Sequence, residues 1–300
     1  MGIKKLFQKA FVGGRWSVAY RDAEKEETVY CYANVGLPKD QWVADPFVFE
    51  HEGRHYLFCE QYETKENRAG IGYFAFENGI PVNKGIVLRR PYHMSYPCLF
   101  SYRGTVYMIP ETSSNGTVEL YRAVEFPHKW ELDTVLLQGR YLDSTVYESE
   151  EGLSLFTYEK RGKEWILTCF ALDMETRTLC KRSGKIYETN VGRPAGKLWQ
   201  EDGKLYRPAQ DCSEKYGEAL IVYRVDSLAP LQETPVQRIT AGQYDLPQKA
   251  DRLHTYNTDN RYAVVDVFQE QFDLLHGWKI FKRSVLKKNR RKERRIGVKK

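Results

Sequence analysis

Short runs of apolar residues recur along the chain and are separated by polar turns that contain Gly or Asn. The run at 44–60 reads ADPFVFEHEGRHYLFCE, and the run at 95–111 reads SYPCLFSYRGTVYMIPE. These two runs align without a gap, so that the turn residues Gly53 and Gly104 coincide. Apolar runs rich in Val, Tyr and Phe are typical of β-strands, and a Gly-containing turn between two of them predicts a tight hairpin.

The same hairpin pattern repeats in three further segments, at 142–159, 194–210 and 252–268. Other strand-like runs fill the gaps between these copies, at 70–76, 117–123, 166–172 and 219–225. Each unit of roughly 50 residues therefore holds about four strands, which is typical of a propeller blade. We predict an all-β chain that folds as a five-bladed β-propeller, and a β-sandwich with coincidental repeats is the alternative. A helical pattern is expected only at 2–10 and 268–276.

Charge is distributed unevenly along the chain. The formal net charge is +6, but residues 279–300 hold twelve Lys or Arg and a single acid, Glu293. The rest of the chain is mildly acidic, which argues against a nucleic-acid partner because phosphate binding needs a basic surface. We therefore expect a lead segment at 1–15, the propeller at 16–275 and a basic tail at 276–300. The tail is expected either to contact anionic lipid at a membrane surface, RNA or an acidic partner, or to remain a solvated, disordered end.

The cysteine residues and the N-terminal segment indicate the cellular compartment, and the spacing of possible metal ligands indicates whether a metal is bound. None of the six Cys residues belongs to a CxxC pair, and Cys59, Cys98 and Cys169 lie inside apolar runs, as buried Cys in a reducing compartment does. The N-terminal segment lacks the apolar core and cleavage site of a signal peptide, so a cytoplasmic location, or a peripheral one at a membrane, is expected. No zinc spacing or calcium loop is present, and we expect neither a metal nor another cofactor.

Polar residues gather at one end of the predicted hairpins. In a hairpin, the start of the first strand lies beside the end of the second strand, and in a propeller the innermost strands line one central channel. The residues at these positions are Asp45, Glu60, His93, Tyr96, Glu111, Asp143, Glu159, Arg193, Arg207, Gln210, Asp211, His254, Asn257 and Asp266. Enclosing so many ionisable groups is costly unless they pair or a ligand uses them. We predict a ligand pocket there, and the alternative is that the Glu residues only brace neighbouring blades.

Several of these residues lie in motifs that resemble known families. WVADPF followed by GRHYLFCE resembles the first blade of the family 43 five-bladed glycosidases. A closer resemblance, over about residues 16–270, is to the N-terminal domain of glucosamine inositolphosphorylceramide transferases and their bacterial stand-alone relatives. The motifs that carry it lie at Ala44–Phe47, His93–Pro97, Met108–Glu111, Arg193–Gly196, Leu205–Cys212 and Tyr216-Gly217. A separate C-terminal glycosyltransferase domain is not expected within these 300 residues.

The resemblance to the glycosidases implies roles for two carboxylates. Asp45 matches the base or nucleophile, and Asp143 matches the residue that tunes the pKa of the acid. The acid Glu expected at the start of blade four is missing, because Arg193 stands there. Since glycoside hydrolysis needs two carboxyl groups, Glu111 or Asp211 is the candidate replacement acid.

Two functions remain open from the sequence. The first is a glycosidase-like or glycosyl-transferring enzyme of cell-surface polysaccharide or glycolipid assembly, in which Arg193 and Arg207 hold an anionic group of the substrate. The second is a non-catalytic carbohydrate-binding protein of such a pathway. In either case, the predicted sugar-binding residues are Glu60, His93, Tyr96, Arg193, Arg207, Gln210, Tyr216, His254 and Asn257.

Overall fold

The computed structural model describes residues 12–25, 29–33 and 36–272 of the chain. It divides into two compact units, of which Trp16–Val267 is the larger. The predicted basic tail and the predicted helix at 2–10 lie outside the described residues. The helix predicted at 268–276 is wrong over its first part, because β21 continues as a strand to Phe272; 273–276 are not described. No helix among the described ranges has the length and apolar character needed to cross a bilayer.

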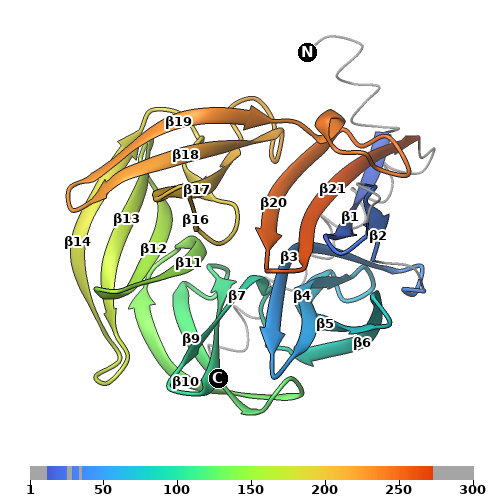
Figure 1. Ribbon diagram of the computed structural model, residues 1–300, viewed down its shortest axis with the longest axis horizontal. Coiled ribbons are helices and arrows are strands. Elements are labelled where there is room, and N and C mark those ends of the chain that lie inside the picture. Colours follow the sequence, from blue (N-terminus) through green and yellow to red (C-terminus); the bar gives the residue numbers. More distant parts are fainter. Residues whose placement is uncertain (1–11, 26–28, 34–35, 273–300) are drawn as a thin grey trace, which may run out of the picture. The chain divides into compact units, whose positions relative to one another are not determined.

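Five antiparallel sheets, the blades, surround a common centre in the unit Trp16–Val267 (Figure 1). Blade 1 contains, from the inner to the outer strand, β3 (Gln41–His51), β4 (Arg54–Glu63), β5 (Arg68–Glu77) and β6 (Ile80–Leu88). Blade 2 contains β7 (Ser95–Tyr102), β8 (Thr105–Thr112), β9 (Thr117–Glu125) and β10 (Lys129–Gln138). Blade 3 contains β11 (Leu142–Ser149), β12 (Gly152–Arg161), β13 (Glu164–Asp173) and β14 (Thr178–Tyr187).

The last two blades depart from this simple order. In blade 4 two short inner strands, β15 (Arg193–Pro194) and β16 (Trp199–Glu201), both pair with β17 (Lys204–Asp211), which is followed by β18 (Ala219–Leu228) and β19 (Leu231–Ile239). The short 3-10 helix η1 (Ala241–Gln243) leads to blade 5. Blade 5 has the order β20 (Arg252–Thr258), β21 (Tyr262–Phe272), β1 (Val12–Asp22) and β2 (Cys31–Tyr32). Strands from both ends of the sequence thus complete one sheet.

Each predicted repeat forms the inner hairpin of a blade, which confirms the five-bladed propeller. The turn residues Glu52, Gly53, Arg103 and Gly104 all have left-handed φ angles, of 51°, 72°, 47° and 77°. Two successive left-handed residues make a type I′ turn, whose twist matches that of the two strands it joins. The repeated turn residues therefore fix the register of the hairpins.

Aromatic side chains fill the interfaces between neighbouring blades. Phe76 of blade 1 stacks on Tyr262 of blade 5, with ring centroids 3.8 Å apart, and Phe58 meets Trp130 of blade 2 edge to face at 5.9 Å. Each fully buried aromatic side chain contributes about 2–3 kcal/mol of hydrophobic stabilisation. This packing holds the inner strands in place around the channel.

Candidate functional site

Three inner strands share one irregularity close to their first residue. Asp45, Tyr96 and Asp143 have left-handed φ angles of 50°, 46° and 44°. Each lies at a bulge, where the pairing of the inner strand with the next strand shifts register. A non-glycine residue in this conformation costs on the order of 1 kcal/mol or more, and a bulge turns the side chain out of the normal alternation. Asp45, Tyr96 and Asp143 therefore occupy equivalent positions, with the same backbone conformation, in the inner strands of blades 1 to 3.

His254 lies between two carboxylates, and we call Asp45, His254 and Asp266 the His254 cluster. Nε2 of His254 is 3.4 Å from Oδ1 of Asp45, and Nδ1 is 2.6 Å from Oδ2 of Asp266. The contact with Asp266 is an ion pair, because its angles do not meet the criteria for a hydrogen bond. Asp266 also accepts the backbone N–H groups of Asp45 at 2.9 Å and of Thr255 at 2.8 Å. Asp266 therefore ties blade 5 to blade 1 and orients the histidine.

Burial and charge set the protonation states of this cluster. Burial raises the pKa of Asp45 to about 7; the His254 cation opposes this shift, and the neighbouring carboxylates add to it. Burial by itself would lower the pKa of His254, but the Asp266 and Asp45 carboxylates outweigh it and raise the pKa to about 9. At neutral pH, His254 is therefore protonated, and Asp45 populates both of its forms.

Two aromatic rings cover His254. The indole of Trp16 stacks on the imidazole, with centroids 4.0 Å apart, and the ring of Tyr216 meets it edge-on at 5.0 Å. Tyr216 keeps 45% of its surface exposed. A Cβ atom on Gly217 would come within 2.9 Å of the Trp16 ring, and the residue has a φ of +63°. Glycine at this position is therefore what lets the Tyr216 loop lie against the cluster.

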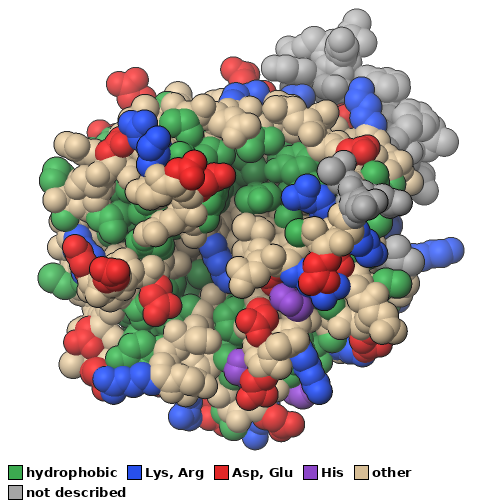
Figure 2. Space-filling view, in the orientation of Figure 1, with side chains coloured by type: hydrophobic (Ala, Val, Ile, Leu, Met, Phe, Trp, Pro, Cys, Tyr) green, Lys and Arg blue, Asp and Glu red, His purple; other side chains and the backbone are tan. Residues whose placement is uncertain are grey.

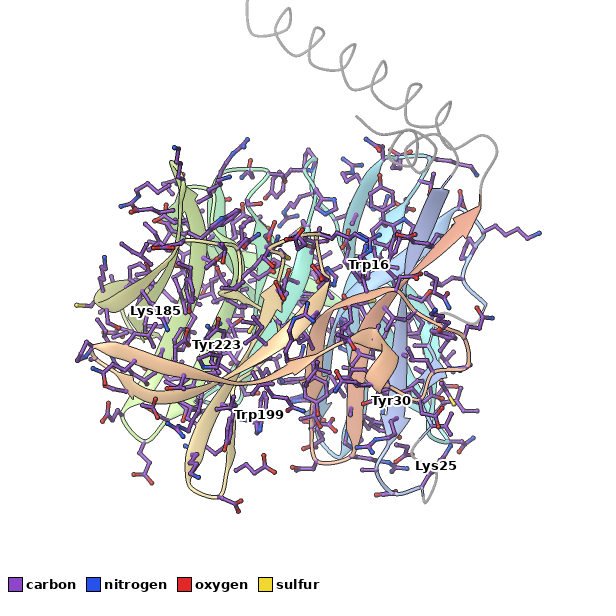
Figure 3. The ribbon with its side chains drawn as sticks, turned by 90° about the horizontal axis from the view of Figure 1, so that it is seen from above. Trp16, Lys25, Tyr30, Lys185, Trp199 and Tyr223 are labelled. Carbon is purple, nitrogen blue, oxygen red and sulfur yellow. The ribbon has the colours of Figure 1, made fainter. Side chains whose placement is uncertain are left out.

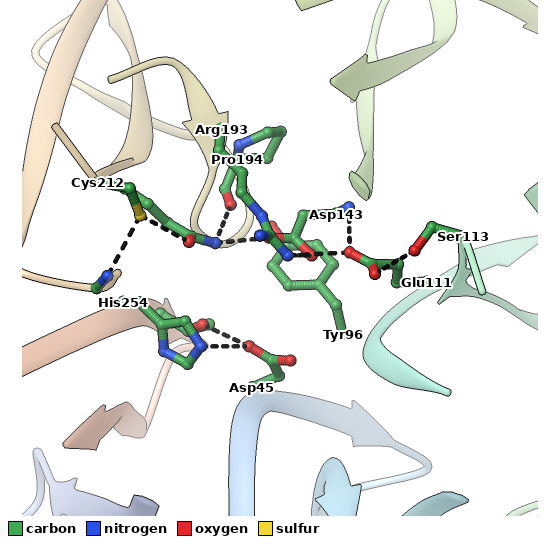
Figure 4. Close-up of polar contacts among 12 residues, drawn as sticks. Asp45, Tyr96, Glu111, Ser113, Asp143, Arg193, Pro194, Cys212 and His254 are labelled. Atoms are coloured by element: carbon green, nitrogen blue, oxygen red, sulfur yellow. Dashed lines mark hydrogen bonds and ion pairs between the residues drawn. The ribbon is translucent and has the colours of Figure 1, made fainter. Parts of the chain in front are cut away.

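A second group forms around the guanidinium of Arg193 (Figure 4), and we call Arg193, Asp143, Glu111 and Gln210 the Arg193 cluster. Arg193 donates to Oδ2 of Asp143 from Nε at 2.6 Å and to Oδ1 from Nη2 at 3.0 Å. Its Nη2 also donates to Oε2 of Glu111 at 3.0 Å, and Gln210 donates to Asp143 at 2.5 Å. The guanidinium lies over the Tyr216 ring, 5.6 Å from the centroid, so Tyr216 joins the two clusters.

The carboxylates of the Arg193 cluster act as acceptors. Burial raises the pKa of Asp143 to about 7, although the adjacent Arg193 cation opposes the shift. Glu111 accepts hydrogen bonds from Arg193, from the Asp143 N–H at 3.2 Å and from the Ser113 hydroxyl at 2.7 Å. Both oxygens of Glu111 are therefore engaged by donors.

Glu60 and His93 form a third contact at the same end of the channel. Nε2 of His93 is 3.2 Å from Oε1 of Glu60, and Nδ1 accepts the Ala69 N–H at 3.3 Å. Because Nδ1 accepts a hydrogen bond, the ring proton lies on Nε2 and points at Glu60. The His93 side chain is 38% exposed, so this pair lies at the surface of the site.

Tyr96 and Asn257 lie beside the clusters but are occupied by the fold. The Tyr96 hydroxyl bonds Thr145 at 2.8 Å, and the tyrosine is completely buried between blades 2 and 3. Asn257 donates to the Pro46 carbonyl at 2.7 Å and accepts the Lys197 N–H at 2.8 Å. Both side chains join neighbouring blades.

Arg207 and Asp211 bond partners outside the two clusters, which differs from the expectation that they face a ligand or supply an acid. Arg207 is completely buried in blade 4 and pairs with Glu233 through Nε and Nη2, at 2.9 Å each. Asp211 accepts from Arg238 at 2.8 Å and from Ser213. Burial would raise the pKa of Asp211, but these donors outweigh it and lower the pKa, opposite to what a general acid requires.

Trp16 belongs to the site but was not predicted from the sequence, because it lies in β1, outside the five repeated hairpins. Asp266 is among the predicted channel residues, but no catalytic or sugar-binding role was predicted for it. Asp45, His254 and Asp266 offer ligand atoms within 4.8 Å of one another and so have the spacing of a metal site. The same carboxylates raise the pKa of His254, so a metal would have to displace a proton in order to bind there. The three side chains form an ion-pair cluster.

The sequence and the structure both have known relatives. The family model described as glucosamine inositolphosphorylceramide transferase 1, N-terminal, matches residues 17–271. The transferase of that name from Arabidopsis thaliana is 32% identical over 212 residues, which make up 67% of this chain and 28% of the relative. The one from Oryza sativa subsp. indica is 30% identical over 218 residues, with the same 67% and 28% coverage. The chain thus spans little more than a quarter of the length of these relatives.

Solved structures of glycoside hydrolases have a similar fold. A thermostable family-43 glycoside hydrolase has a TM-score of 0.58 at 12% identity and covers 79% of this chain and 91% of its own. The β-xylosidase RS223 has a TM-score of 0.55 at 9% identity and covers 80% of this chain and 94% of its own. At these identities the likeness concerns the fold alone.

Proposed function

The chain belongs to the family of the N-terminal region of glucosamine inositolphosphorylceramide transferase 1, and from this membership we propose that it is a carbohydrate-active protein of glycolipid assembly. The named transferase relatives are much longer than this chain, which spans 28% of them. The proposal therefore concerns what the propeller itself does. We propose that it recognises a sugar at the two clusters and does not hydrolyse it.

The observation that carries this proposal is the position of Arg193. It stands at the start of blade 4, where the resemblance to the glycosidases implies an acid Glu, and it neutralises Asp143 and Glu111 instead. Of the two candidate replacement acids, Glu111 accepts three hydrogen bonds and Asp211 pairs with Arg238. Hydrolysis needs a carboxyl group that can donate a proton to the leaving oxygen, so this arrangement favours binding.

The charges of the site favour a neutral or cationic sugar. Five acidic side chains surround the channel end, those of Asp45, Glu60, Glu111, Asp143 and Asp266. Even with Asp45 and Asp143 partly protonated, their charges outnumber the two cations, Arg193 and His254. A uronate or phosphate would meet net repulsion, whereas hydroxyl groups or an ammonium group would find acceptors. The exposed ring of Tyr216 offers a flat face for a sugar to stack on. An amino sugar such as glucosamine fits this chemistry.

A binding experiment with three related sugars tests the proposal. Glucosamine, N-acetylglucosamine and glucuronate would be titrated into the purified chain, and the thermal midpoint and the heat of binding would be measured. We expect glucosamine to bind best and glucuronate worst. We also expect Tyr216→Ala to weaken binding, whereas Tyr102→Ala, at the turn end of β7 where the hydroxyl donates to Glu175, does not. Equal or tighter binding of glucuronate, or an unchanged affinity in Tyr216→Ala, would refute the assignment.

An enzyme acting at the anomeric carbon is the second candidate, and the state of Asp45 favours it. A carboxyl group whose pKa is about 7, beside a protonated His254, has the properties of a group that gives or takes a proton. Turnover of aryl glycosides or sugar nucleotides that disappears in Asp45→Asn would replace the binding proposal with this one. Sugar binding without turnover would leave the binding proposal in place.

We also propose that the protein works in the cytoplasm at an anionic membrane surface. The buried thiols of Cys59, Cys98 and Cys169 suit a reducing compartment, and the Lys- and Arg-rich segment 279–300 suits anionic lipid. Deleting 279–300 is expected to abolish sedimentation with phosphatidylserine vesicles while leaving behaviour with phosphatidylcholine vesicles unchanged. Undiminished sedimentation with phosphatidylserine after the deletion would refute the membrane role.

A further inference from the structure

A cavity opens between blades 4 and 5, on the face of the propeller away from the two clusters. Its volume is about 750 Å³, within the range of small-molecule sites, and it shares no lining residue with the two clusters. Figure 3 shows Trp199 and Tyr30 of this cavity toward the lower face of the unit, and Trp16 of the central site toward the upper face. Figure 2 shows a recess with hydrophobic side chains on the face seen there. The cavity is therefore separate from the central site.

Aromatic rings from four different segments form the walls of the cavity. Trp199 comes from β16, Tyr256 from β20, Tyr30 from the segment before β2, and Tyr244 from the segment after η1. Trp199 and Tyr256 meet edge to face at 6.1 Å, and Tyr30 and Tyr244 do so at 5.2 Å. Apolar side chains such as Leu220 and Val222 complete the lining. Such rings give a ligand flat apolar faces against which it can pack.

Arg21 is the cation among the described residues that line the cavity. Its Nε is buried and has no hydrogen-bond partner among the described residues, and its guanidinium lies 6.0 Å from the centroid of the Tyr30 ring. A buried donor without a partner costs about 1–3 kcal/mol. A ligand oxygen would pair with the terminal Nη groups of Arg21, because Nε itself is closed to solvent.

The remaining polar groups define the charge of the ligand. Glu201 and Asp245 also line the cavity and are exposed, so two acids face the single cation of Arg21. The amide of Gln237 adds a donor and an acceptor. These side chains repel a polyanion, and they suit ligand groups that both donate and accept hydrogen bonds. Hydroxyl groups on a ring with an apolar face have both properties.

We propose that this cavity binds a short uncharged oligosaccharide, as a second sugar site on the face opposite the clusters. Sugar rings would pack against Trp199 and the tyrosines, and their hydroxyl groups would pair with Arg21, Glu201 and Asp245. The inference does not depend on the central site. A propeller with sugar sites on both faces would hold two parts of one glycan, or two glycans.

Calorimetric titration of the full chain with neutral trisaccharides tests the inference. The probes are cellotriose, mannotriose, xylotriose and arabinotriose, with trigalacturonate as the anionic counterpart. We expect one neutral probe to bind, and we expect Trp199→Ala to weaken it about tenfold, since the stacking surface is lost. Arg21→Gln is a second variant, and it keeps the aromatic walls. Trp165→Ala is the matched control. Trp199 stacks on Tyr206 of the adjacent strand β17 at 5.7 Å, and Trp165 stacks in the same way on Tyr158 of the adjacent strand β12 at 5.6 Å, but it lies in blade 3.

Three outcomes would overturn the inference. One is that none of the neutral probes binds, and another is that only trigalacturonate binds. The third is that binding falls in Tyr216→Ala and is unchanged in both Trp199→Ala and Arg21→Gln, which would assign the trisaccharide to the central site. A normal unfolding midpoint for Arg21→Gln shows that its loss of binding is not a loss of folding.

Discussion

Replacing Arg193 by Gln tests the most heavily charged part of the central site. Arg193 donates to both oxygens of Asp143, at 2.6 and 3.0 Å, and to Glu111 at 3.0 Å. Removing one partner of a buried ion pair costs about 3–5 kcal/mol, because the remaining charge stays in a poorly solvated place. We expect Arg193→Gln to lower the free energy of unfolding by this amount wherever Asp143 remains ionised.

The cost should depend on pH in a defined direction. Burial already raises the pKa of Asp143 to about 7 with Arg193 present, and losing the cation raises it further. At about pH 5.5, Asp143 is protonated in the variant, so the substitution removes mainly hydrogen bonds and lowers the free energy of unfolding by about 1–2 kcal/mol. At about pH 8.5 protonation becomes unfavourable and the cost rises toward about 3–5 kcal/mol.

Urea unfolding followed by tryptophan fluorescence at the two pH values measures this difference. Arg238→Gln is the control, because Arg238 pairs with Asp211 at 2.8 Å but its side chain is 46% exposed. Such a surface pair contributes about 0–1 kcal/mol. If Arg193→Gln costs no more than Arg238→Gln at about pH 8.5, or costs the same at both pH values, the ion-pair reasoning is wrong.

Three further predictions concern stability. Protonation of Asp45 and Asp143 stabilises the fold, because their pKa of about 7 in the folded state lies above the unfolded value of about 4. This stabilisation is complete below about pH 4 and is lost as the pH rises through about 7. The urea concentration at the unfolding midpoint should therefore be lower at about pH 8 than at about pH 5. Protonation of His254 also stabilises the fold. This stabilisation is complete below the unfolded pKa of about 6.5 and is lost as the pH rises through the folded pKa of about 9, so His254→Gln should abolish the decline of the urea midpoint in this pH range. An equally steep decline of the midpoint in that variant would contradict the assignment. Gly196→Ala should cost about 3 kcal/mol or more, because its Cβ would lie 1.9 Å from the Tyr256 carbonyl at a φ of +143°, whereas Gly203→Ala, with open space around it, should cost about 1 kcal/mol. Equal thermal midpoints for the two glycine variants would contradict the steric argument.

Much of the fold could be predicted because its signals are local. The alternation of apolar residues and the paired left-handed turn residues, such as Arg103 and Gly104, act within one hairpin. Five copies of one hairpin then determine the number of blades. The pairing of β1 with β21 was not predicted, because it joins two ends of the chain that have no repeat in common.

The candidate site was predicted less completely, and β17 shows why. Side chains alternate along a strand, so Gln210 faces one way while Arg207 and Asp211 face the other. Gln210 accordingly reaches Asp143, whereas Arg207 and Asp211 bond Glu233 and Arg238 of β19. The alternation was visible in the sequence, but all three residues were assigned to one pocket because they lie at the same end of a repeat.

The sequence by itself determined the all-β architecture, the five repeated units and the end of the channel where ionisable groups collect, since each depends on neighbours within one hairpin. Only the tertiary structure decided which groups meet. His254 lies between Asp45 and Asp266, and Arg193 bridges Asp143 and Glu111, because ring closure brings together strands that are far apart in the chain. Charge and burial then act over a few ångströms in space, whatever the separation in sequence.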